Sequence, residues 1–224
     1  MRFPLAPAAL LALSLAGCGA ADAPRTVVTL GDSVPAGTAC SCSPFPALYA
    51  RSQHATDVNL AVPGMTAADV LSAVPAERHA LSTASEVVIM AGANDIAGVV
   101  GQPSAYAPAA NGVRDDVVST VTAIERIHRV RVVVLGYWNV VEDGQVGAAA
   151  YGPDGVRDAA RATEVLNTAL REAAARTGAL FVPTVAAFHG PSGDRDPTGL
   201  LAADGDHPDA AGHAVIAALL PPLP

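Results

Sequence analysis

Lysine is missing altogether from the 224 residues, so all 13 basic residues are arginines. A phosphate-binding P-loop is therefore excluded, because its signature requires a lysine. Aromatic residues make up only 4% of the chain and the formal net charge is -8, which leaves neither a basic surface nor the interleaved aromatics that bind nucleic acid. We expect no nucleic-acid partner.

Charged residues are scarce as well, at 15% of the chain, whereas 51% of the residues are hydrophobic. A chain of this length and balance can bury one sizeable core, built here mainly from alanine, valine and leucine. No internal repeat is visible. We expect one globular domain that acts as a monomer.

The amino-terminal stretch has the pattern of an export signal. Arg2 precedes an apolar run over residues 3–17, which is too short to span a bilayer comfortably. The run ends in Leu15-Ala16-Gly17-Cys18, which resembles the bacterial lipobox, in which the cysteine is lipidated and becomes the mature amino terminus. A plain secretory signal cut near Ala20 or Ala21 is the alternative.

This pattern divides the chain into a signal peptide at 1–17, a short tether at 18–24 and a folded domain at 25–224. Lipidation of Cys18 predicts an outward-facing lipoprotein of the cell membrane. The protein is secreted instead if the lipobox is not used.

Export also bears on Cys40 and Cys42, because oxidising compartments favour disulfides. The two cysteines are two positions apart, so a bridge between them closes a very small ring. Two free or buried thiols are the alternative. Neither cysteine has the histidine-rich spacing of a structural zinc site, and we expect no metal ion.

Apolar runs and helical periodicity alternate along the chain. Strands are expected at 27–30, 57–62, 86–91, 130–137 and 179–182. Helices are expected at 44–53, 66–74, 113–129, 156–177 and 208–220, and loops at 96–112, 138–155 and 183–206. Strands that alternate with helices predict a parallel, doubly wound α/β sheet.

Three of the expected strands end in conspicuous turns. These turns are Gly31-Asp32-Ser33, Pro63-Gly64 and Gly92-Ala93-Asn94-Asp95. In a parallel sheet the carboxyl ends of the strands meet at one edge, where ligand sites form. The three turns therefore predict a site.

Ser33 is the candidate nucleophile of this site. A serine hydroxyl needs a base to remove its proton and a third group to orient that base. Asp204 and His207 have the residue types and the spacing for these two roles, because three residues apart they lie on one side of a single turn. Pro208 favours presentation of His207 from the start of the last helix.

Negative charge that develops on an attacked carbonyl needs hydrogen-bond donors. The candidates are the backbone N–H groups of Ser33 and Gly64 and the side-chain amide of Asn94. Taken alone, Gly64 and Asn94 are equally typical of turns.

Together, the three turns and Asp204-Gly205-Asp206-His207-Pro208 are similar to the four sequence blocks of the SGNH, or GDSL, family of serine hydrolases. The resemblance implies Ser33 as nucleophile, His207 as general base and acid, Asp204 as its orienting partner, and Ser33, Gly64 and Asn94 as the oxyanion hole. It also implies a three-layer α/β/α, flavodoxin-like fold with five parallel strands, and no cofactor.

The expected substrate is an oxygen ester, either of a lipid or short acyl chain or an acetyl group on a carbohydrate. Two other classes stay open at this point. One is a binding lipoprotein that keeps the fold without catalysis, and the other is a metal-dependent phosphoesterase.

The other histidines and the single tryptophan are assigned as follows. His54, His79 and His128 are expected at the surface and His213 in local packing. His189 lies in a loop that can approach the site, and Trp138 either lines the substrate pocket or covers the core.

Overall fold

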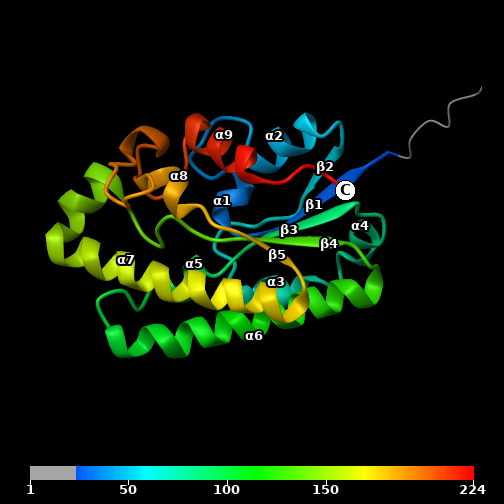
Figure 1. The fold of residues 1–224 in the computed structure, drawn as a ribbon, viewed down its shortest axis with the longest axis horizontal. Coiled ribbons are helices and arrows are strands. Elements are labelled where there is room, and N and C mark those ends of the chain that lie inside the picture. The colour runs from blue at the N-terminus through cyan, green and yellow to red at the C-terminus, as the bar shows by residue number, and fades with distance from the viewer. Residues whose placement is uncertain (1–23) are drawn as a thin grey trace, which may run out of the picture.

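The computed structural model describes residues 24–224, which fold around a sheet of five parallel strands (Figure 1). The strands are β1 (Thr26–Gly31), β2 (Thr56–Asn59), β3 (Glu86–Met90), β4 (Arg131–Leu135) and β5 (Leu180–Val182). Their order is β2-β1-β3-β4-β5, the flavodoxin-like order, so the predicted fold class is confirmed. The predicted signal peptide and Cys18 lie outside the described residues.

Helices cover both faces of the sheet. They are α1 (Ser33–Ala36), α2 (Phe45–Ser52), α3 (Ala67–Ala73), α4 (Arg78–Ser82), α5 (Ala93–Ala97), α6 (Pro103–Ile127), α7 (Gly144–Thr177), α8 (Val185–His189) and α9 (Ala210–Leu219), with a 3₁₀ turn, η1 (Thr198–Leu200). One layer contains α2 and α9, and the other contains α3, α6 and α7 (Figure 1). Every residue of β3 is buried between the layers, as expected for a central parallel strand. Within the described residues, no helix has the length and apolarity needed to cross a membrane.

The prediction of a loop over 96–112 is wrong for residues 103–112, because α6 already begins at Pro103. Proline, glycine and alanine obscure the helical pattern there. Tyr106, Ala110, Val113 and Val117 are buried at spacings of three or four residues, which is the period of one helix face. Burial of this face outweighs the unfavourable Pro108.

The loop predicted over 138–155 is also shorter than expected, because α7 begins at Gly144. Its first turns are separated from the main helix by a kink at Gly152, whose φ of 63° and ψ of -178° are non-helical. The main helix was predicted from residue 156. The preceding turns were missed because their alanines and glycines carry no amphipathic pattern.

The last helix begins at Ala210 and not at Pro208 as predicted. Asp209 is its N-cap, and the Asp209 carboxylate accepts hydrogen bonds from the N–H groups of Ala211 and Gly212. Pro208 instead forms an isolated β-bridge with Leu201. His207 is therefore presented from a loop that is closed by this bridge, and not from a helix start.

A sharp turn after β1 positions Ser33. Gly31 has a φ of +154°, and a Cβ at this residue would lie 2.1 Å from the carbonyl oxygen of Met90. The next N–H group, that of Asp32, donates to the same oxygen at 3.2 Å. Only glycine allows this close approach of β1 to β3.

Asp32 is a buried carboxylate, with a residue exposure of only 1%. Its oxygens accept hydrogen bonds from the Val34 N–H group, at 3.0 Å, and from the Tyr137 hydroxyl. Burial raises the pKa of Asp32 to about 6, although both hydrogen bonds and the nearby His207 act in the opposite direction. The residue that caps the short helix at Ser33 thus has a carboxyl pKa of about 6.

The turn at Gly31 gives the first prediction. Gly31→Ala should lower the free energy of unfolding by roughly 3 kcal/mol or more, because the new Cβ collides with backbone. Chemical denaturation measures the change. Gly98→Ala is the control, since a Cβ at Gly98 meets nothing within 4 Å. Equal stabilities of the two variants would contradict the argument.

The raised pKa of Asp32 gives the second prediction. Between pH 4 and 6 Asp32 holds a proton in the folded state that it has released in the unfolded chain, so its contribution to the free energy of unfolding should fall by about 3 kcal/mol as pH rises. Asp32→Asn should remove this slope from a denaturation series. Asp154→Asn, at a side chain 93% exposed, should keep it. Parallel curves for wild type and Asp32→Asn would show that Asp32 does not titrate there.

Candidate active site

Ser33 lies at the carboxyl edge of the sheet, as the first residue of α1. Asp32 caps this short helix, and Gly37 ends it in the left-handed conformation with a φ of 80°. The Ser33 side chain lines a cavity of about 250 Å³. Asn94 and His207 line the same cavity, so the structure brings together three residues that are distant in sequence.

Asp204 and His207 form a hydrogen-bonded pair. The His207 Nδ1 atom lies 2.8 Å from Asp204 Oδ2. The other carboxylate oxygen accepts from the backbone N–H groups of Asp206, at 3.0 Å, and His207, at 3.1 Å. Burial opposes ionisation of Asp204, but these hydrogen bonds outweigh it and lower the pKa of the carboxyl group. Since Nδ1 is engaged, Nε2 is the nitrogen left to exchange a proton with Ser33.

The loop that carries this pair is fixed by backbone hydrogen bonds. Ala202 donates to the His207 carbonyl at 2.8 Å and accepts from Gly205 at 2.9 Å. The Asp143 N–H group, at the start of α7, donates to the Gly205 carbonyl at 2.7 Å. The imidazole is therefore held from two directions, which limits its freedom to leave the cavity.

The other two turns are clamped to each other beside Ser33. The Asn94 side-chain amide donates to the Met65 carbonyl at 2.8 Å, and Asp95 accepts from the Ala67 N–H group at 3.0 Å. Gly64, with a φ of +85°, is exposed and a Cβ there would meet nothing within 4 Å. Asn94 keeps a second amide N–H for a ligand. Gly64 is next to Met65 but is not part of the cavity wall.

Several residues of the cavity were not found from the sequence. The Tyr137 hydroxyl donates a hydrogen bond to Asp32, and Tyr151, in the first turns of α7, lines the cavity. Tyr137 is the second residue after β4, so its place near a strand end was a usable signal. Tyr151 had no such signal, because the first turns of α7, which carry it, were not predicted.

The remaining histidines divide as expected. His54, His79 and His128 are exposed and His213 is fully buried. His189 does not reach the active-site cavity; its Nε2 atom lies 3.0 Å from Asp143 Oδ2, in the wall of a neighbouring cavity. Hydrogen bonding to Asp143 raises the pKa of His189.

Trp138 fulfils both of its expected roles. It is 3% exposed and stacks on Phe188 with ring centroids 4.1 Å apart, so it covers the core. It also lines the active-site cavity.

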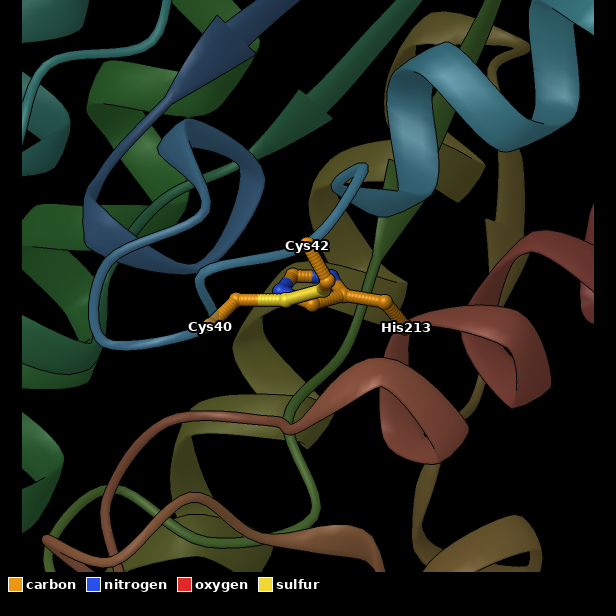
Figure 2. A group of neighbouring side chains, drawn as sticks. All are labelled: Cys40, Cys42 and His213. Atoms are coloured by element: carbon orange, nitrogen blue, oxygen red, sulfur yellow. A yellow bond between two sulfur atoms is a disulfide. The ribbon is translucent and has the colours of Figure 1, made fainter.

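Cys40 and Cys42 are joined by a disulfide in the structure, with Cα atoms 5.1 Å apart. The ring of His213 lies beside them (Figure 2), and one ligand atom from each of the three residues falls within 4.8 Å of the others. Both sulfurs are used in the disulfide, and His213 Nδ1 accepts from the Phe45 N–H group at 3.2 Å. In this state the group does not fit a metal ion.

The acidic residues of the last loops do not form a metal cluster in the described part of the chain. Asp194 accepts a hydrogen bond from the Ser192 hydroxyl, Asp196 accepts one from the Thr198 hydroxyl, and Asp209 is the N-cap of α9.

Comparison with known proteins extends this description. The family model for the GDSL-like lipase/acylhydrolase family matches residues 29–215. A search of curated proteins found no match.

Solved structures share the fold. A lipase, Lip_vut3, from a goat rumen metagenome is 17% identical, with 87% of this chain and 94% of that chain covered and a TM-score of 0.71. A catalytic mutant of the acetylxylan esterase Axe2 from Geobacillus stearothermophilus is 18% identical, with 87% and 91% covered and a TM-score of 0.65. Phospholipase A1 from Streptomyces albidoflavus NA297 is 21% identical, with 88% and 100% covered and a TM-score of 0.61.

The family model includes all three strand-end turns and the Asp204–His207 loop, and it covers most of the chain. The chain therefore belongs to the GDSL-like lipase/acylhydrolase family.

Proposed function

We propose that this acylhydrolase is an exported serine esterase that cleaves oxygen esters through an acyl-enzyme on Ser33. The observation that supports this most directly is the Asp204–His207 pair, whose imidazole lines the same cavity as Ser33. This geometry supports Ser33 as the nucleophile, His207 as the base and Asp204 as the orienting carboxylate.

The first half of the reaction transfers the acyl group to the enzyme. His207 Nε2 takes the Ser33 proton while Oγ attacks the ester carbonyl, and Asp204 stabilises the resulting imidazolium. The N–H groups of Ser33 and Gly64 and the Asn94 amide donate to the oxyanion. Collapse of the tetrahedral intermediate breaks the carbon–oxygen bond, and His207 returns the proton to the leaving alcohol.

The second half uses water in place of Ser33. His207 removes a proton from the water, the hydroxide attacks the acyl-enzyme, and the Ser33 oxygen leaves with the proton from His207. Each oxyanion donor contributes roughly a 10²- to 10³-fold rate effect in hydrolases of this kind. These steps use groups of the chain, the substrate and one water molecule.

The substrate class includes lipid or short acyl esters and acetylated carbohydrates. The names of the similar structures include a lipase, a phospholipase and an acetylxylan esterase, so both kinds of alcohol are found among them.

The amino terminus supports a membrane location. We infer that the lipobox at 15–18 places a lipid on Cys18 and that only residues 19–25 separate the anchor from β1. The enzyme would then act close to the outer side of its membrane.

A fluorophosphonate probe tests the nucleophile. Ser33 should be labelled, and Ser33→Ala should lose the label and lower kcat for p-nitrophenyl acetate by about 10⁴-fold or more. Ser82→Ala, at an exposed serine of α4, is the control. A chelator should leave the wild-type rate unchanged. Full activity in Ser33→Ala, or abolition by the chelator, would favour a different mechanism such as that of a metal-dependent phosphoesterase.

Fractionation of expressing cells tests the anchor. Cys18→Ser should move the protein from the membrane fraction to the soluble or secreted fraction, because the lipidated thiol is removed. Cys42→Ser, which keeps Cys18, should stay with the membrane. Retention of Cys18→Ser in the membrane fraction would mean that another segment holds the protein there.

A further inference from the structure

A second cavity, of about 680 Å³, lies next to the catalytic one. Its walls come from one face of α7 and from the segment that follows β5, which lie at the same end of the molecule (Figure 1). The volume falls in the range of about 300–1,000 Å³ that small-molecule sites occupy. The mechanism described above makes no use of this cavity.

The two cavities share a wall. Trp138 and Asn139, in the connection that follows β4, line both of them. Asp143, in the wall of the second cavity, donates its N–H group to Gly205 in the loop between Asp204 and His207. The second cavity is thus on the His207 side of the active site.

The proposed reaction predicts that the alcohol portion of the substrate lies on this side. His207 gives its proton to the leaving oxygen, so the alcohol portion must lie against His207. The oxyanion donors Gly64 and Asn94 follow β2 and β3, which flank β1 in the sheet. The second cavity is formed after β4 and β5, beyond the oxyanion donors, where the alcohol portion would extend.

Acidic side chains outnumber basic ones in the second cavity by four to three. Its titratable side chains are His189, Arg171 and Arg195 on the basic side and Asp143, Glu164, Asp194 and Asp196 on the acidic side. His189 is paired with Asp143, and the Arg195 guanidinium donates to the carbonyls of Phe188 and Ala187. This arrangement lacks the free cationic cluster that recognises a phosphate. Charged side chains also interrupt the apolar surface of this cavity, so it does not suit an acyl chain.

The remaining walls combine hydrogen-bonding groups with an indole. Thr168 on the main part of α7 and Gln145 in its first turns line the cavity and are exposed. Asn167 lines it as well, but its side-chain amide is hydrogen-bonded to the backbone of Tyr137. The Trp138 Nε1 atom is buried without a hydrogen-bond partner among the described residues. An N–H donor left in this state favours a ligand that offers an acceptor.

We propose that the second cavity binds the alcohol portion of the ester, and that this portion is a neutral, short saccharide. The proposal rests on the proposed esterase function. Hydroxyl groups of such a ligand match the amide, hydroxyl and carboxylate groups of the walls. The catalytic cavity, at about 250 Å³, takes a short acyl group such as acetyl.

Direct binding is measured in Ser33→Ala, which cannot turn the ligand over. Trp138 is the only tryptophan, so its fluorescence reports on the shared wall. Xylobiose and cellobiose should each give a saturable change. Ala160→Phe, added to Ser33→Ala, fills the cavity from an exposed position of α7 and should weaken binding about tenfold or more.

Ala175→Phe is the matched control, because Ala175 is also exposed on α7 and lies outside this cavity. In enzymes with Ser33 intact, Ala160→Phe should lower the ratio of kcat/KM for monoacetylated xylobiose to kcat/KM for p-nitrophenyl acetate about tenfold or more. Ala175→Phe should leave this ratio as in wild type.

The outcomes separate this inference from the proposed function. If wild type is labelled by the fluorophosphonate but neither disaccharide binds, the saccharide assignment is wrong and the esterase stands. Saturable binding of dodecylphosphocholine in place of the disaccharides would assign the cavity to a lipid instead. If Ser33 is neither labelled nor required for ester cleavage, the esterase mechanism fails and the cavity is not its alcohol site, even where a disaccharide binds.

Discussion

The close approach of Gly31 to Met90 is the constraint on which the active site depends. It sets β1 against β3 at the last residue of each strand, where Gly31 pairs with Met90. The chain must then turn away within one residue, and Asp32 caps the short helix that begins at Ser33. Because β3 ends at the same level, Asn94 follows beside Ser33. The placement of Ser33 beside Asn94 is thus a consequence of strand register.

His207 is held at this edge by contacts of a different kind. Asp204 and His207 belong to a loop without regular secondary structure, and the Leu201–Pro208 bridge and the Asp143–Gly205 hydrogen bond hold it. A cap at Asp209 then starts α9, which packs against α2. The loop is fixed at both ends, so the imidazole needs little ordering when a substrate arrives, which favours catalysis.

The sequence predicted the sheet and the grouping of Ser33, Asn94, Asp204 and His207 because β-branched runs and strand-end turns are local signals. It predicted the first turns of α6 and α7 as loops, since alanine and glycine carry no hydrophobic period and long-range burial decides their structure. For the same reason Tyr151 was not recognised. The partner of Asp32, Tyr137, is 105 residues away, a contact that a single sequence does not specify.

The connections at the carboxyl edge of the sheet have two different roles in the cavities. The turns after β1, β2 and β3 build the reaction centre, whereas the first turns of α7 and the segment after β5 build both the outer wall of the catalytic cavity and the second cavity. Connections at a sheet edge tolerate change because they carry little of the core. Family motifs therefore locate the candidate active site, and the cavity that we propose for the alcohol portion is built by connections that these motifs do not describe. Trp138 lies where the two parts meet: it follows β4, stacks on Phe188 from α8 and lines both cavities.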